Sequence, residues 1–253
     1  MHLHLPTPTY VISDAHLGAA PPDAERALVR FASGAARDAK AVVINGDLFD
    51  FWFEWRQVMP RTGYRVLAAL ADLCDAGVEV LWIAGNHDCW GGQPLVDAGV
   101  RYHVGPWRGA IGPWETLIEH GDGLRDAEDA PYRRLRSVLR NPLAIWAFRN
   151  LLHPDWAAAL ARRTSHTSRH MRPRDGGEGL RQVALQRLAS DPGLRLYLYG
   201  HSHAAALERA PSGGILANPG AWMDGPSALR IRDDGVALVS GDGVLQAQRE
   251  IGR

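Results

Sequence analysis

Short apolar runs in this sequence repeatedly stop at a small residue and are followed by Asp, Asn or His. The clearest example is Ala41 to Ile44, which leads through Gly46 to Asp47. Apolar runs of this length are typical of buried strands. The pattern occurs at five places, and the polar residues that follow the runs are Asp14, His16, Asp47, Asn86, His87, His120, His201 and His203. We therefore expect these strand ends to meet around one shared site, with Asp47 at its centre.

Helical periodicity lies between the runs. Apolar residues recur at helical spacing over about residues 23–39 and again over about 62–76. The last third of the chain reads as short strands broken by Gly, Pro and Asp. This alternation predicts an α/β chain.

A different pattern covers residues 131–172, where no strand is indicated. Three helical pieces are predicted, at 132–140, 143–152 and about 155–164, with breaks before Pro142 and Pro154. Asp155 is the predicted N-cap of the third piece. The middle piece is apolar on nearly all sides, and arginines cluster around it. The segment is interpreted as a helical insertion.

Composition excludes several classes of protein. The 253 residues carry 28 basic and 28 acidic side chains, so the formal net charge of zero gives no case for a nucleic-acid partner. The two cysteines suit a reducing compartment and lack zinc-finger spacing. No signal peptide or membrane-spanning apolar run is evident. We expect a cytoplasmic protein that can also touch the cytoplasmic face of the inner membrane.

The strand-end residues have the chemistry of a metal site. In Asp14-x-His16 and His201-x-His203 both side chains lie on the same side of an extended segment. Mixed Asp, Asn and His ligands suit divalent Mn, Fe, Zn or another first-row metal. Seven ligands, one of them shared, suffice for two ions, and a two-metal site is typical of phosphoryl transfer to water.

The chain resembles the calcineurin-like metallophosphoesterases. The matching blocks are Ser13-Asp14-Ala15-His16, Gly46-Asp47-Leu48-Phe49-Asp50, Gly85-Asn86-His87-Asp88, His120-Gly121-Asp122 and Gly200-His201-Ser202-His203. The resemblance implies a four-layer αββα sandwich of two mixed sheets flanked by helices. It also implies that Asp14, His16 and His203 bind one metal, that Asn86, His120 and His201 bind the other, and that Asp47 bridges them. Two divalent ions, manganese first, are the implied cofactors. In many members the counterpart of His87 contacts the scissile phosphate or protonates the leaving oxygen.

Within that superfamily, the insertion is similar to that of the UDP-2,3-diacylglucosamine pyrophosphohydrolases of lipid A synthesis. That resemblance implies one domain over residues 1–253 with a helical lid at 125–175 that holds acyl chains. The implied reaction is attack of water on the α-phosphate of this nucleotide-sugar lipid, which releases UMP and 2,3-diacylglucosamine 1-phosphate. The implied substrate contacts are Asn86, His87, Asp129, Ser165, Arg169, Arg172 and His201.

One other function stays open, and a third is disfavoured. Many of those hydrolases have Arg where this chain has His87, which favours a broader phosphodiesterase or pyrophosphatase acting on nucleotides or another lipid-linked phosphate. A non-catalytic binding module requires lost ligands, and all seven are present. The insertion helices could equally be a structural cap. The aromatic run Phe51–Trp55 is either a substrate entrance or a buried loop, and Cys89 is interpreted as a buried spectator.

Overall fold

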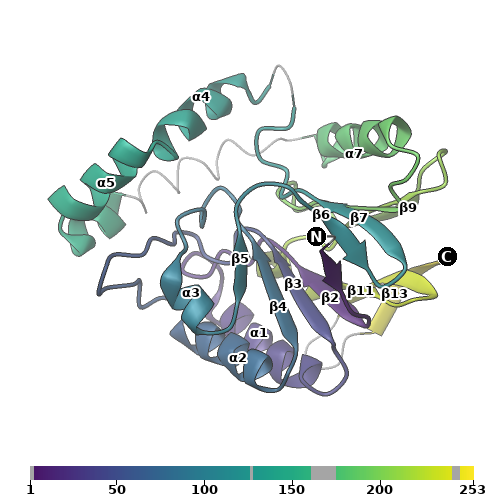
Figure 1. Cartoon of the computed structure of the whole chain (residues 1–253), viewed down its shortest axis with the longest axis horizontal. Coiled ribbons are helices and arrows are strands. Elements are labelled where there is room, and N and C mark those ends of the chain that lie inside the picture. Colours follow the sequence, from purple (N-terminus) through teal and green to yellow (C-terminus); the bar gives the residue numbers. More distant parts are fainter. Residues whose placement is uncertain (1–2, 126–127, 161–174, 241–245) are drawn as a thin grey trace.

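The apolar runs before Asp14, Asp47 and Asn86 form the centre of a seven-stranded sheet in the computed structural model, which describes residues 3–125, 128–160, 175–240 and 246–253 (Figure 1). Its strand order is β13-β12-β11-β2-β3-β4-β5. The strands are β2 (Thr9–Ile12), β3 (Ala41–Asn45), β4 (Glu79–Ile83), β5 (Arg101–His103), β11 (Ser227–Ile231), β12 (Gly235–Ser240) and β13 (Gln246–Gly252). Strands β2 to β5 run parallel, and β11 to β13 continue the sheet with antiparallel pairing.

A second sheet of six strands has the order β1-β6-β7-β8-β10-β9. The strands are β1 (His4–Leu5), β6 (Trp107–Ile111), β7 (Trp114–Ile118), β8 (Leu196–Leu198), β9 (Ala206–Arg209) and β10 (Ile215–Asn218). Strands β7, β8 and β10 run parallel, whereas β6 and β9 pair antiparallel with β7 and β10. Both sheets are therefore mixed.

Alternate side chains of the central strands enter two different cores, because successive residues of a strand point to opposite faces. Ile12 and Ile44 face the helices on one side of the seven-stranded sheet. Val11 and Val43 face the second sheet and pack there with Leu198. Burial on both faces explains why these strands read as unbroken apolar runs.

Helices cover both outer faces. The seven-stranded sheet is covered by α1 (Pro22–Ala35), α2 (Tyr64–Asp75) and α3 (Gln93–Asp97), and the six-stranded sheet by α7 (Glu178–Ser190). Figure 1 shows the resulting order of layers, from α1 and α2 below the sheets to α7 above them. The predicted sandwich of two mixed sheets flanked by helices is confirmed.

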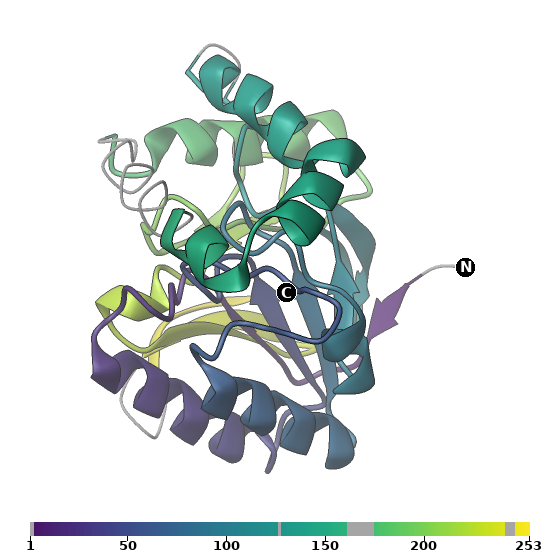
Figure 2. The ribbon, with the colours of Figure 1, turned by 90° about the vertical axis from the view of Figure 1, so that its left-hand side faces the viewer.

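The insertion follows β7 and precedes α7. It contains α4 (Ala130–Leu139), α5 (Pro142–Leu151) and a helical stretch at 154–160. Figures 1 and 2 show α4 and α5 standing away from the two sheets. The predicted break at Asn141 is confirmed, since its side chain accepts from the amides of Leu143 and Ala144 at the start of α5. The prediction of Asp155 as an N-cap is wrong, because the helix already begins at residue 154. Pro154 suits that first position, where a missing N–H leaves no helical bond unmade.

None of the helices in the described ranges combines the length and the apolar character that a bilayer span requires.

Candidate metal centre

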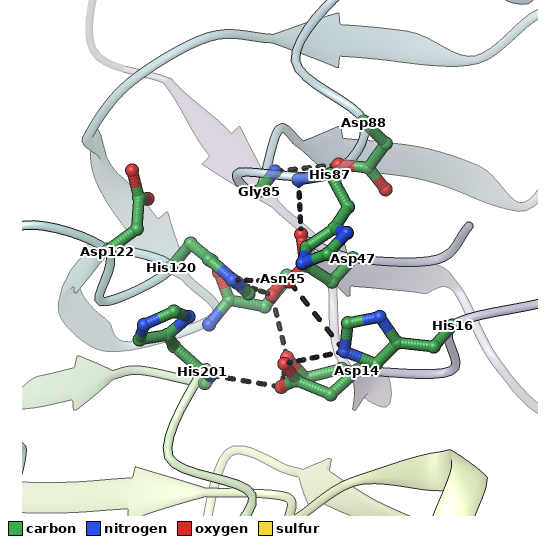
Figure 3. Close-up of polar contacts among 12 residues, drawn as sticks. Asp14, His16, Asn45, Asp47, Gly85, His87, Asp88, His120, Asp122 and His201 are labelled. Carbon is green, nitrogen blue, oxygen red and sulfur yellow. Dashed lines mark hydrogen bonds and ion pairs between the residues drawn. The ribbon is translucent and has the colours of Figure 1, made fainter. Parts of the chain in front are cut away.

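The predicted strand ends meet at one edge of the two sheets. Asp14 and His16 follow β2, Asp47 follows β3 and His120 follows β7. Parallel strands bring their carboxyl ends to the same edge, so residues far apart in sequence converge there. Figure 3 shows these side chains pointing toward one another, with His201 on the opposite side from His16.

One group of possible ligands consists of Asp14, His16 and His203. His203 Nε2 lies 3.4 Å and His16 Nε2 lies 3.8 Å from Asp14 Oδ1. The two imidazole Nε2 atoms are 3.3 Å apart. Three ligand atoms thus converge from β2 and from the loop after β8.

A second group consists of Asp47, His120 and His201, whose ligand atoms lie within 4.8 Å of one another. Asp47 Oδ2 is 3.3 Å from His120 Nε2 and 3.7 Å from His16 Nε2. Asp47 therefore lies between the two groups. Asn86 follows Gly85 and precedes His87, whose backbone N–H donates to Asp47 Oδ1 at 2.9 Å.

The imidazoles of His120 and His87 are oriented by backbone carbonyls. His120 Nδ1 lies 2.8 Å from the Asn45 carbonyl oxygen, and His87 Nδ1 lies 2.8 Å from that of Asp50. A carbonyl accepts, so in each ring Nδ1 donates a proton to it and Nε2 points away from that carbonyl. His120 Nε2 is thereby directed at Asp47.

The backbone at the predicted ligands is held in an uncommon conformation. Within the described residues, five that are not glycine have positive φ between 43° and 60°. They are Asp14, His16, Asp47, His201 and His203. Residues other than glycine rarely adopt this left-handed region, because it strains their backbone. Backbone strain of this kind persists where the surrounding structure holds it, and it is concentrated at functional sites.

Two glycines permit the close approach of these loops. A Cβ at Gly46, where φ is +82°, would stand 2.2 Å from His120 Nδ1. A Cβ at Gly85 would stand 2.1 Å from Asp47 Oδ1. Neither distance is possible between non-bonded atoms, so the glycines in front of Asp47 and Asn86 are required by packing at the site.

Electrostatics keep the central carboxylate ionised. Burial raises the pKa of Asp47, but His120 and His87 outweigh it and hold that pKa well below its usual range. Burial lowers the pKa of His120, and Asp47 outweighs it, so this pKa lies well above its usual range. Burial and His120 together lower the pKa of His201, which keeps that imidazole neutral and able to bind a cation.

The donor atoms fit divalent ions. Asp14 Oδ1 and Asn86 Oδ1 are buried and accept no hydrogen bond from the residues that the structure describes. Buried polar atoms are nearly always partnered, so two such oxygens at one edge call for a ligand. Carboxylate, amide and imidazole donors together match a first-row divalent metal.

Supporting residues at this edge were missed from the sequence. Asp88 is buried and accepts from Leu48 N at 2.7 Å and Gly85 N at 2.8 Å, so it ties together the loops after β3 and β4. Burial and the neighbouring Asp47 raise the pKa of Asp88 to about 7. Asp224 Oδ2 lies 3.6 Å from His203 Nδ1, beyond hydrogen-bond length, so it places a negative charge beside this imidazole. Asp88 stood within a recognised block, whereas nothing in the sequence marked Asp224.

The structure describes only some of the residues that are predicted to contact the substrate. Asp129 is buried, and its carboxylate accepts from the backbone and the guanidinium of Arg125 at 3.0 and 2.6 Å. Its predicted contact with substrate stays a prediction. Ser165, Arg169 and Arg172 lie outside the described residues.

The structure also shows the surroundings of the aromatic run and of Cys89. In the run Phe51–Trp55, Phe53 and Trp55 are buried and form a cluster with Phe148 of α5, so the run is mainly a buried loop under the insertion. Burial raises the pKa of the Cys89 thiol to about 12, which agrees with a spectator.

Comparison with known proteins identifies the family of the chain. The calcineurin-like phosphoesterase family matches residues 7–205. The chain belongs to this family. The predicted resemblance is thereby confirmed, and this calcineurin-like phosphoesterase is a metal-dependent hydrolase.

The UDP-2,3-diacylglucosamine hydrolase of Porphyromonas gingivalis is 33% identical to this phosphoesterase over 216 residues, which cover 77% of the chain and 82% of the relative. The protein of the same name from Pseudomonas putida is 31% identical over 234 residues, or 90% of the chain and 96% of the relative. Among solved structures, vacuolar protein sorting 29 from Cryptosporidium parvum aligns over 97% of both chains with 15% identity and a TM-score of 0.47.

Proposed function

We propose that Asp14, His16 and His203 hold one divalent ion, that Asn86, His120 and His201 hold the other, and that Asp47 is shared. The buried oxygens of Asp14 and Asn86, which accept no hydrogen bond from the described residues, support a cation on each side of Asp47. Manganese is the proposed ion, with iron, zinc or another first-row metal as the alternatives that the same donors accept. When bound, the pair would polarise a phosphoryl oxygen and lower the pKa of water.

The proposed substrate is UDP-2,3-diacylglucosamine. The observation that carries this proposal is the similarity to hydrolases named for that substrate, at 30–33% identity over most of both chains. In the reaction, a water oxygen forms a bond to the α-phosphorus and the bond from that phosphorus to the bridging oxygen breaks. The products are UMP and 2,3-diacylglucosamine 1-phosphate.

His87 is proposed to act on the departing oxygen or on the scissile phosphate. Its Nδ1 lies 2.8 Å from the Asp50 carbonyl oxygen, and this hydrogen bond fixes the orientation of the ring. The ring meets that of His16 edge-on with centroids 4.9 Å apart, which holds it beside the first group of ligands. A protonated Nε2 at this place would donate to the leaving oxygen as a general acid.

The insertion is proposed to be a lid, spanning about residues 125–175, within a single domain of residues 1–253. Its inner side rests on the aromatic run through Phe148 and Ala157. Its outer side exposes large apolar side chains, among them Leu143, Trp146 and Trp156 with 77, 57 and 74% of their surfaces accessible. Exposed tryptophan and leucine beside arginines suit acyl chains and the interface of an anionic membrane. We propose a cytoplasmic enzyme that contacts the inner membrane through this surface.

Purified protein with Mn²⁺ should release UMP from UDP-2,3-diacylglucosamine with a kcat/KM well above that for bis(p-nitrophenyl) phosphate. Liquid chromatography of the nucleotide product measures the first reaction and absorbance measures the second. Equal values for the two substrates would contradict the proposed substrate, although the phosphoesterase activity would stand.

Membrane contact is tested by sedimentation with vesicles that contain anionic phospholipid. The double variant Trp146→Ser/Trp156→Ser should lose most of the bound fraction. Val96→Ser on α3 removes an apolar side chain that is 53% exposed at another place on the surface, and this variant should bind as wild type does. Equal binding of all three proteins would contradict the assignment of this surface.

A broader phosphodiesterase is the second candidate. His87, where many diacylglucosamine hydrolases have Arg, favours it. Faster turnover of water-soluble cyclic nucleotides than of any acylated substrate would make it the better description.

A further inference from the structure

Helix α4 is attached to the body by polar contacts. None of its residues is buried, so it lacks the apolar contact face that usually fixes a helix. Two polar residues of the helix and the residue that directly follows it are spaced by four and therefore share one face. They are Tyr132, Arg136 and Arg140. That face meets a single carboxylate, Asp122, which follows His120 by two positions.

The contacts converge on one oxygen. Tyr132 Oη donates to Asp122 Oδ2 at 2.7 Å. Arg136 Nη1 lies 3.4 Å and Arg140 Nη2 lies 3.6 Å from the same atom, and Arg136 also donates to the Asp122 carbonyl at 3.1 Å. Asp122 is only 8% exposed. Charge-assisted contacts to a buried carboxylate are among the stronger polar interactions in proteins.

The far end of α4 reaches the loop after β4. Trp90 Nε1 donates to the carbonyl of Leu139 at 3.1 Å. Arg140 also interacts with the Cys89 thiol. Cys89 and Trp90 directly follow the block Asn86-His87-Asp88. Helix α4 therefore connects two loops that carry proposed ligands of the same ion, Asn86 and His120.

We propose that Asp122 is a positioning residue that fixes the insertion over the metal centre. It does so through Tyr132 and the two arginines, and it need not touch the substrate. The inference rests on the proposed function in one respect, namely that a lipid-linked substrate uses the insertion. Loss of the anchor should then weaken capture of that substrate and spare a small phosphodiester that needs only the centre.

The test compares Tyr132→Phe and Asp122→Asn with Arg134→Gln. Tyr132→Phe removes one hydrogen bond and no charge, so it leaves the electrostatics around His120 unchanged. Arg134 is an exposed arginine of the same helix and is the matched control. Amide hydrogen exchange in residues 130–139, metal content, and KM and kcat on both substrates are measured.

Tyr132→Phe should raise amide exchange in α4 and the KM for UDP-2,3-diacylglucosamine about ten-fold, with turnover of bis(p-nitrophenyl) phosphate within about two-fold of wild type. Asp122→Asn should have a larger effect on exchange, and Arg134→Gln none. Wild-type exchange in both anchor variants, or equal effects of Tyr132→Phe and Arg134→Gln, would overturn the proposal. If wild type does not hydrolyse the lipid substrate, the proposed function fails, and the exchange data alone decide whether Asp122 anchors α4.

Discussion

The metal centre and the insertion are built in opposite ways. At the centre, proposed ligands such as Asp14 and Asp47 are buried and their backbones are held in the left-handed region. Gly85 leaves no free space beside Asp47. In the insertion, α4 and α5 have no buried residue, and large side chains such as Trp146 face outward. The centre is determined from many directions at once, whereas the insertion rests on a few contacts.

The metal centre and the insertion are therefore suited to different tasks. Phosphoryl transfer requires groups placed to within a fraction of an ångström, and the two packed sheets supply that rigidity. A long, flexible lipid does not need such precision. A segment held by Asp122 and by the aromatic cluster around Phe53 can change its outer surface without disturbing the centre. Substitutions at the centre should therefore have large effects on chemistry, and substitutions in the insertion should act on substrate choice.

The largest effect is expected from Asp47→Ala. Removing the carboxylate that is proposed to be shared by both ions should lower kcat/KM for any phosphodiester by about 10³-fold or more, or about 4 kcal/mol. The protein should also retain less than two bound ions, as measured by elemental analysis. Asp72→Ala, on the exposed side of α2, is the control and should be unchanged. Full hydrolysis by Asp47→Ala would invalidate the whole assignment of the centre.

His87→Gln should follow, with a loss of about 10²-fold. If His87 protonates the leaving oxygen, the loss should grow across a series of aryl phosphodiesters as the leaving phenol becomes more basic. His103→Gln, at a surface position on β5, is the matched control. A loss of equal size across the series would mean that His87 binds the phosphate and transfers no proton.

Gly85→Ala should lower activity about 10-fold and the free energy of unfolding by about 1–3 kcal/mol, since its Cβ would overlap Asp47. Denaturant unfolding and steady-state kinetics measure the two effects. Gly193→Ala, whose Cβ would meet its nearest neighbour at 3.4 Å, should be neutral. Equal behaviour of the two variants would show that the centre tolerates more movement than its packing indicates.

The smallest effect concerns Glu54, which stands in the chain between Phe53 and Trp55 of the aromatic cluster and accepts from Trp52 Nε1 at 3.0 Å. Burial raises the pKa of Glu54 in the folded protein. Protonated Glu54 therefore favours folding at low pH, and this contribution is lost as the pH rises through the raised pKa. Glu54→Gln stays neutral, so its free energy of unfolding relative to wild type should increase between pH 4.5 and pH 8.

Urea unfolding at several pH values measures this difference. The exposed residue Glu250 provides the control, since Glu250→Gln should show no such trend. A pH-independent difference for Glu54→Gln would mean that its carboxyl is as well solvated in the folded protein as in the unfolded chain.

The sequence predicted the chemistry better than its supports. Asp14, Asp47 and His120 could be recognised because each follows a buried run, and local patterns of that kind survive in a single sequence. Asp224 could not, since its approach to His203 depends on how the chain returns to the edge of the sheet after β10. The helix α7 was missed for a related reason. It buries only Leu180, Ala184 and Leu188, and its apolar pattern is too weak to stand out from the sequence.

The insertion was predicted as helices with correct breaks, because proline acts on its immediate neighbours. Its attachment was not predicted. The spacing of Tyr132, Arg136 and Arg140 is visible in the sequence, but a polar stripe on a helix usually faces solvent. Only the position of Asp122 in space gives that stripe a partner.

The proposed ligands come from both sheets: Asp14, His16, Asp47 and Asn86 from loops of the seven-stranded sheet, and His120, His201 and His203 from loops of the six-stranded one. A bound pair of ions would therefore hold the two sheets together across their interface. Binding that is confined to the folded chain adds about 2.7 kcal/mol to stability at a free ligand concentration 100 times the dissociation constant. The supply of metal would then set how long the protein survives proteolysis as well as how fast it turns over, so that a cell short of the ion would lose the enzyme itself along with its activity.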